Sequence, residues 1–211
     1  TGSLLDIGCG TGDFLVAMRS FPGWTVRGLE PSPIAAAQAR TRSGLDVDQV
    51  FLDEAAYPDA AFDVVTLFDV LEHLPDPRGA LRRIQSWLRP EGIVVLGLPN
   101  RRSLEAKLFG KYWAGLDVPR HYSVFAPDDV RRLLGETGYA PPEIFNLTGG
   151  YFSFVLSVCF WLTGTGASEL QRSVLDMLLQ SIPFRTLTYP AFLLLKTLRL
   201  GSTMMVVAQK G

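Results

Sequence analysis

Cysteine, charge and long apolar runs are all scarce in this sequence. The chain of 211 residues has two cysteines, Cys9 and Cys159, too few for a disulfide framework or a four-cysteine zinc site. Charged residues make up 19% and the net charge is −1, so the basic surplus of proteins that bind phosphate backbones is missing and no nucleic-acid partner is expected. No signal peptide is visible, and a reducing, cytoplasmic location is the simplest expectation.

Apolar residues are plentiful, and they follow an alternating order over the first 100 residues. Hydrophobic residues make up 47% of the chain, enough for the core of one α/β domain spanning 1–211. Short apolar runs alternate with helical patterns, which predicts a doubly wound, mostly parallel sheet. Strands are expected at Ser3–Ile7, Trp24–Leu29, Gln49–Leu52, Phe62–Phe68 and Ile93–Leu98, with helices at Asp13–Ser20, Ile34–Arg42 and Pro77–Leu88.

The remaining residues are less regular. A helix is expected over Ala126–Thr137, and Glu143–Thr148 and Ser202–Gln209 are expected to close the sheet, the last strand running antiparallel. Between these strands lies a helical insertion, at about 149–201, with apolar stretches at Tyr151–Thr163 and Leu187–Leu200. Each stretch is shorter than the roughly 20 residues that a membrane span needs.

A glycine-rich loop follows the first predicted strand, where open α/β sheets bind ligands. Gly8 and Gly10 permit backbone turns and close ligand approach. Asp6 ends the first strand, and Glu30 follows the second, where a carboxylate would accept hydrogen bonds from two ribose hydroxyls. A dinucleotide would suffer repulsion between its pyrophosphate and Asp6, and the third glycine, Gly12, comes one residue early. S-adenosylmethionine carries an ammonium instead, which a carboxylate stabilises.

Several motifs, in order and at the right spacing, resemble the class I S-adenosylmethionine-dependent methyltransferases. The subgroup most similar includes ubiquinone-pathway O-methyltransferases and enzymes of bacterial surface-polysaccharide gene clusters. The resemblance implies a Rossmann-like fold and S-adenosylhomocysteine as product. The matching segments are Leu4–Gly12, Gly28–Ser32, Asp53–Glu54, Phe62–Val65, Asp69–Leu74 and Leu88–Gly92.

The resemblance also implies roles for single residues. Asp6, Gly8 and Gly10 would surround the methionine part of the cofactor, and Phe68 would line its side. Glu30 would bind the ribose. The adenine ring would contact Pro31, and its amino group would be bound by Asp53 with Glu54 beside it.

The candidates for catalysis follow the fourth predicted strand and the fifth. Asp69, Glu72 and His73 would share one face if their segment were helical, and His121 lies in a loop at the same edge of the sheet. We weigh three interpretations. One histidine acts as a general base for O-methylation; or the four residues bind Mg²⁺, Mn²⁺ or Zn²⁺, as in plant-type small-RNA 2′-O-methyltransferases that they resemble; or they are structural.

The sequence favours methylation of a small or lipid-linked hydroxyl acceptor. A nicotinamide-dependent oxidoreductase and a non-catalytic S-adenosylmethionine-binding module are the alternatives. The insertion, with Arg185, Lys196 and Arg199 near its second apolar stretch, would form a lid, a homodimer interface or a contact with the inner membrane surface.

Overall fold

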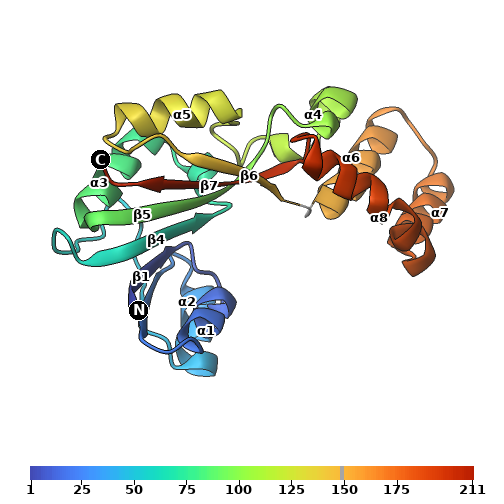
Figure 1. Cartoon of the computed structure of the whole chain (residues 1–211). Coiled ribbons are helices and arrows are strands. Elements are labelled where there is room, and N and C mark those ends of the chain that lie inside the picture. Colours follow the sequence, from blue (N-terminus) through green and yellow to red (C-terminus); the bar gives the residue numbers. More distant parts are fainter. Residues whose placement is uncertain (148–149) are drawn as a thin grey trace. The chain divides into compact units, whose positions relative to one another are not determined.

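The computed structural model describes residues 1–147 and 150–211, and only the backbone at residues 172 and 176. Within these residues, seven strands form one sheet in the order β3-β2-β1-β4-β5-β7-β6 (Figure 1). The strands are β1 (Gly2–Ile7), β2 (Trp24–Leu29), β3 (Val47–Asp48), β4 (Phe62–Phe68), β5 (Leu88–Pro99), β6 (Glu143–Leu147) and β7 (Thr203–Gln209).

The sheet is doubly wound, as predicted. β1 pairs in parallel with both β2 and β4, β2 pairs in parallel with β3, and β4 pairs in parallel with β5. The strand order therefore reverses between β1 and β4, which is where such sheets bind their ligands. β7 runs in the opposite direction to these strands (Figure 1). The predicted antiparallel last strand is confirmed.

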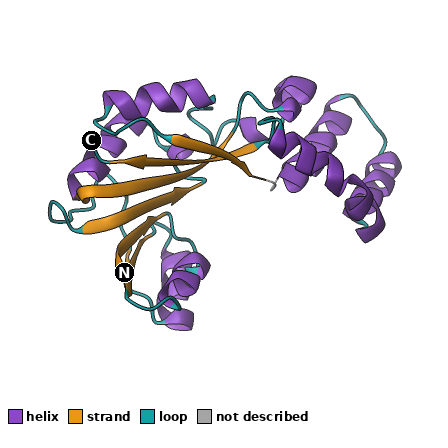
Figure 2. Cartoon of the chain, in the orientation of Figure 1, coloured by secondary structure: helices purple, strands orange, loops and turns teal. Residues whose placement is uncertain are grey.

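The central strands are buried on both faces, which explains their near-continuous apolar sequence. Leu4, Leu5 and Ile7 of β1 are almost wholly buried, as are Val65 and Leu67 of β4. Helices flank these strands in the secondary-structure view (Figure 2). The helices are α1 (Asp13–Arg19), α2 (Pro33–Ser43), α3 (Pro77–Trp87), α4 (Leu104–Phe109), α5 (Pro127–Glu136), α6 (Gly150–Gly164), α7 (Glu169–Gln180) and α8 (Ile182–Thr197).

Capping residues set where the early helices begin. The Ser32 hydroxyl accepts a hydrogen bond from the backbone N–H of Ala35, and Pro33 is the first residue of α2. The Asp76 carboxylate likewise accepts from Gly79 N–H at 2.9 Å at the start of α3. Each cap satisfies an N–H group that has no partner inside the helix.

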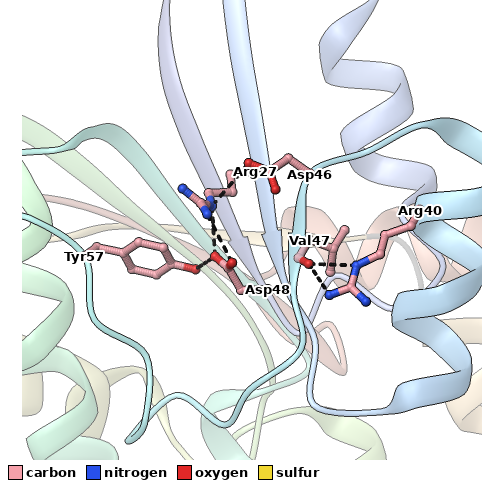
Figure 3. A network of polar contacts seen from close by, with 6 residues as sticks. All are labelled: Arg27, Arg40, Asp46, Val47, Asp48 and Tyr57. Atoms are coloured by element: carbon pink, nitrogen blue, oxygen red, sulfur yellow. Dashed lines mark hydrogen bonds and ion pairs between the residues drawn. The ribbon is translucent and has the colours of Figure 1, made fainter.

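The third strand lies earlier than predicted. The prediction placed it at Gln49–Leu52, but β3 is Val47–Asp48, in register with the end of β2. The apolar pair at positions 51 and 52 misled the prediction, because Leu52 is buried from a turn rather than from a strand. Polar contacts fix Val47–Asp48 in place (Figure 3), since Arg40 donates two hydrogen bonds to the carbonyl of Val47.

The fifth strand is longer than predicted. It begins at Leu88 instead of Ile93, and its pairing with β4 jumps from Phe62↔Leu88 to Val64↔Ile93. The segment Pro90–Gly92 is therefore an irregularity within one strand. Glu91 has a φ of 66° there, the left-handed conformation that lets the strand depart from regular pairing.

Three helices, α6, α7 and α8, make up the predicted insertion. Thr148, the expected end of the sixth strand, and residue 149 lie outside the described residues. A small apolar core joins α6 to α7 through Val155, Val158 and Leu179. Among the described residues, no helix is long and apolar enough to cross a membrane.

The chain forms two compact units. The first contains residues 1–97, 130–143 and 206–211, and the second contains residues 98–129 and 144–205. The second unit thus includes 32 residues, 98–129, that precede the predicted insertion. All of the predicted cofactor residues belong to the first unit.

Candidate functional site

The glycine loop between β1 and α1 is held against the end of β2. The N–H groups of Gly8 and Cys9 both donate to the carbonyl of Leu29, at 2.7 and 3.2 Å. Gly8 and Gly10 have φ values of 72° and 54°, which favour glycine. A Cβ on Gly8 would collide with Val70, whereas a Cβ on Gly10 would meet nothing within 4 Å. The loop is therefore packed at Gly8 and open at Gly10.

Glu30 is oriented by two backbone N–H groups. Its Oε2 accepts from Gly10 at 2.9 Å and its Oε1 accepts from Ser32 at 2.8 Å. The residue is only 9% exposed. Each carboxylate oxygen has lone pairs left over, so Glu30 presents two fixed acceptors side by side. That arrangement suits a pair of vicinal hydroxyls, as a ribose provides.

Asp6 is a second buried carboxyl at the same edge of the sheet. It is 4% exposed, and the Thr66 hydroxyl donates a 2.5 Å hydrogen bond to its Oδ1. Burial raises the pKa of Asp6, the Thr66 hydrogen bond lowers it and the charge of Glu30 raises it, and the net result is a pKa of about 6. A cation bound here would relieve the cost of burying the ionised form.

Cys9 is close enough to feel the charges of both acids, but it is not a reactive thiol. Burial, followed by the charges of Asp6 and Glu30, raises its pKa to about 12. A thiol with such a pKa stays protonated and is a poor nucleophile at neutral pH. Neither Cys9 nor Cys159 forms a disulfide.

The acidic turn predicted to bind adenine follows β3. Asp53 and Glu54 are exposed there, and Arg83 donates to the Asp53 carbonyl at 2.7 Å. Farther along, the Tyr57 hydroxyl donates to Asp48 Oδ2 at 2.6 Å (Figure 3). The backbone of the turn is thus anchored while its carboxylates face solvent. Pro31, two residues beyond the end of β2, is half-buried.

The polar contacts drawn in Figure 3 hold the segment after this turn against the sheet. The Arg27 guanidinium donates two hydrogen bonds to Asp48, at 2.8 and 3.1 Å. It also lies 3.5 Å from Asp46 and above the ring of Tyr57. One cation therefore stabilises an acid on each side of Val47.

Phe68 ends β4 and is partly exposed. Its ring packs edge-to-face against Phe14, with centroids 5.1 Å apart. Gly97 of β5 lies so close to it that a Cβ would come within 2.9 Å of the ring. Phe68 is therefore held in one position beside the first turn of α1.

The segment after β4 is not an α-helix. Asp69 has a φ of 53°, and a single 3-10 turn, η1 (Leu71–His73), follows. The shared helical face that spacing would give Asp69, Glu72 and His73 therefore does not form. Glu72 is 1% exposed, and among the described residues its carboxylate has no hydrogen-bond partner. Burial raises the pKa of Glu72 to about 7, and the charge of Asp69 adds to the shift.

His121 belongs to the second unit, and its ring is nearly buried. Its Nδ1 lies 2.9 Å from the carbonyl oxygen of Gly115, and its Nε2 lies 3.9 Å from Asp117. A carbonyl only accepts hydrogen bonds, so Nδ1 carries the proton and Nε2 is the basic nitrogen of the neutral ring. Arg120 pairs with Asp117 at 2.5 Å. His73 lies in the first unit, and its sharing of a pocket with His121 stays a prediction, as does the metal site.

Comparison with known proteins places the chain in a family. A methyltransferase-domain family matches residues 1–143, and the chain belongs to it. Over 149 residues it is 34% identical to the 27-O-demethylrifamycin SV methyltransferase of Amycolatopsis mediterranei, with 65% of this chain and 54% of that one covered. It is also 34% identical over 158 residues to the ubiquinone biosynthesis O-methyltransferase of Thiobacillus denitrificans, with 69% and 67% covered.

The fold agrees with this membership. The chain superposes on an S-adenosylmethionine-dependent methyltransferase from Thermotoga maritima with a TM-score of 0.66, at 17% identity, covering 100% of this chain and 83% of that one. The class is thus S-adenosylmethionine-dependent, and the alternative of a nicotinamide-dependent oxidoreductase is wrong. The chain matches only about half to two thirds of the length of the two sequence relatives.

The residues present fit the cofactor of this class. Fixed acceptors on Glu30 suit the ribose, buried Asp6 suits the ammonium, and the open space at Gly10 allows close approach to the loop. Sequence reasoning missed Thr66, which holds Asp6. Its signal was available, because Thr66 is the polar exception near the middle of an apolar strand and pairs in register with Asp6.

Proposed function

We propose that this chain transfers the methyl group of S-adenosylmethionine to a hydroxyl oxygen of a small or lipid-linked acceptor. The observation that carries the proposal is the Glu30 carboxylate, fixed by Gly10 and Ser32 beside the buried Asp6. The names of both sequence relatives, which describe methyltransferases acting at oxygen, support the choice of a hydroxyl acceptor.

Different residues would bind the methionine part, the ribose and the adenine of S-adenosylmethionine. When bound, S-adenosylmethionine supplies an electrophilic methyl group. Asp6, Gly8 and Gly10 hold the methionine part, with Phe68 beside it. Glu30 binds the ribose hydroxyls through charge-assisted hydrogen bonds. The remaining contacts, to the adenine ring, come from Pro31, Asp53 and Glu54.

His121 is the better-supported general base. Its Nε2 is the basic nitrogen, and Asp117 at 3.9 Å would stabilise the imidazolium after proton uptake. His73 is the second candidate. A divalent metal bound by Asp69, Glu72, His73 and His121 is the alternative means of activating the hydroxyl.

Turnover measurements separate these roles. Release of S-adenosylhomocysteine is measured with phenols, with prenylated phenols and with anilines of the same ring. We expect release with the phenols, and release with anilines alone would contradict O-methylation.

His121→Ala should lower turnover about 10²–10⁴-fold with cofactor affinity unchanged. If a chelator abolishes turnover and Mg²⁺ or Mn²⁺ restores it, the metal replaces the base.

We also propose that α7 and α8 contact the surface of the inner membrane. Both helices expose large apolar side chains, and the exposed cations of α8 and the turn after it suit anionic lipids. The apolar residues are Leu170, Val174, Met177, Leu178, Ile182, Leu187, Leu193, Leu194 and Leu198, and the cations are Arg185, Lys196 and Arg199.

Vesicle co-sedimentation tests the membrane contact. We expect the chain to sediment with vesicles of phosphatidylglycerol and phosphatidylcholine but not with phosphatidylcholine alone. Failure to sediment with either, together with a dimer in sedimentation velocity, would instead favour a homodimer formed through the insertion.

A further inference from the structure

A large cavity lies within the second unit, between α6 and α8. Its volume is about 860 Å³, within the ~300–1,000 Å³ of small-molecule sites. Tyr151, Val155, Leu156 and Cys159 of α6 line one side, and Phe192 of α8 lines another. Every lining residue lies in the second unit, so the cavity is distinct from the cofactor residues of the first unit.

The walls of the cavity are apolar, with one cation. Aromatic and aliphatic side chains predominate, and the charged member is Arg185 of α8. Its guanidinium lies 5.5 Å from the centre of the Tyr151 ring, a cation–π contact that fixes it without neutralising its charge. No acidic side chain is found among the described residues that line the cavity. Arg185 is itself exposed, so its charge is available to a ligand.

We propose that this cavity binds the apolar chain of a single-chain amphiphile whose phosphate group pairs with Arg185. Apolar walls account for the chain, and a guanidinium that makes no ion pair with a described residue accounts for the anion, because arginine binds phosphate through paired hydrogen bonds. That this amphiphile is also the methyl acceptor rests on the proposed function. The binding of the amphiphile in the cavity does not depend on it.

Charge decides against a second copy of the chain as the occupant. A symmetric dimer places the same surface on both sides of its axis. From Met177 to Gly211 the sequence contains Arg185, Lys196, Arg199 and Lys210 but no aspartate or glutamate. Two copies meeting through α8 would bring cations together without anions from that segment, whereas a phosphate-bearing amphiphile supplies the missing charge.

Titration with dodecyl phosphate tests the proposal on the intact chain. The titration is followed by calorimetry below the micelle concentration of the amphiphile, in the absence of cofactor. We expect saturable binding at one site, and at least tenfold weaker binding of dodecyltrimethylammonium and of inorganic phosphate. Equal binding of the cationic and the anionic amphiphile would overturn the proposal, because it would show adsorption by the tail alone.

Two variants with a matched control locate the site. Leu156→Trp fills the cavity, and Arg185→Gln removes its charge. Phe160→Trp is the control, since Phe160 lies on α6, is 46% exposed, does not line the cavity and is not among the residues proposed to contact the membrane. We expect at least a tenfold loss of dodecyl phosphate affinity in each cavity variant and none in the control. An equal loss in all three, or in none, contradicts the proposed site.

Cys159 gives a measurement that needs no variant. Its half-buried thiol lines the cavity, and the buried Cys9 thiol has a strongly raised pKa. Dodecyl phosphate should slow alkylation of Cys159 severalfold, and an unchanged rate would overturn the proposal. S-adenosylhomocysteine affinity is measured in parallel. If the intact chain binds dodecyl phosphate but not S-adenosylhomocysteine, the proposed function is contradicted and the assignment of the cavity stands.

Discussion

Glu30 has both carboxylate oxygens engaged by backbone N–H groups, so its side chain holds the loop in addition to its proposed role of binding the ribose. Glu30→Ala should weaken S-adenosylhomocysteine binding by about 1.5–3 kcal/mol, which is roughly tenfold to over a hundredfold in affinity. Calorimetry measures the loss, with Asp59→Ala, at an exposed acid, as the control. Unchanged affinity in a folded Glu30→Ala chain would contradict the ribose assignment.

Asp6 should make cofactor binding depend on pH. With its pKa raised to about 6, mainly by burial, the carboxyl is ionised at pH 7.5 and half-protonated near pH 6. Only the ionised form attracts the cofactor's ammonium, so S-adenosylhomocysteine affinity should fall as the pH falls through 6. Thr66→Val removes a hydrogen bond that lowers the pKa, and the midpoint should move upward. An identical midpoint in both chains would show that Asp6 is not the titrating group.

Glu105 should reduce the stability of the second unit at high pH. Its carboxyl, 4% exposed, accepts a hydrogen bond from Ser153 at 3.0 Å. Burial raises its pKa from 4.5 to about 7. The folded state therefore holds the proton more tightly than the unfolded state. The resulting cost is present above pH 7 and disappears as the pH falls from 7 towards 4.5.

Replacing Glu105 with Gln tests this direction of the pH dependence of stability. Glu105→Gln keeps a polar group for Ser153 but cannot ionise. The free energy of unfolding should rise by about 2 kcal/mol at pH 8 and change little at pH 5. Urea titrations of both chains at the two pH values measure the difference, and an equal change at both would refute the buried-charge explanation.

At the scale of single elements, the hydrogen bond from Tyr57 to Asp48 joins the end of β3 to the segment that follows the acidic turn predicted to bind adenine. Tyr57→Phe keeps the ring, which packs edge-to-face on Phe62 and Trp87, and removes only the hydroxyl. Stability should fall by about 1–3 kcal/mol, as for a hydrogen bond to a charged group, and S-adenosylhomocysteine affinity should fall severalfold. Tyr122→Phe, at an exposed tyrosine, is the control. Equal behaviour of the two variants would show that the contact does not hold the turn.

Elements with strong local signals could be predicted, and those fixed by distant side chains could not. β2 and β4 lie at their predicted residues, because an apolar run flanked by polar residues marks a buried strand. β3 is two residues long and is fixed by Arg40 and Tyr57 from elsewhere in the chain. No local pattern reveals such contacts, and the buried Leu52 offered a stronger apolar signal nearby.

The candidate site shows the same division. Asp6 and Glu30 could be predicted because strand ends place side chains at the ligand-binding edge of a parallel sheet. The 3-10 turn at Leu71–His73 could not, since it depends on Asp69 adopting a left-handed backbone. The Gly115 carbonyl that sets the tautomer of His121 could likewise not be predicted, because it belongs to a single 3-10 turn, Ala114–Leu116, that has no marked local pattern.

On the scale of the whole molecule, binding of the cofactor should not need the helical insertion. The proposed cofactor residues all lie in the first unit. A chain in which a short turn replaces residues 149–201 should therefore bind S-adenosylhomocysteine with unchanged affinity but lose methyl transfer and vesicle binding. Calorimetry and co-sedimentation measure these properties. Full turnover in the shortened chain would contradict an acceptor role for the insertion, and circular dichroism checks that the sheet persists.

The strand order carries a consequence for how the protein is made. β7 is the last strand of the sheet in sequence, yet it lies between β5 and β6. During synthesis, β6 therefore leaves the ribosome about 60 residues before its neighbour β7. At the ~5–20 residues added per second, its edge waits several seconds for a partner. Over that interval a nascent chain has an open strand edge, and completion of the sheet coincides with the end of translation of this segment.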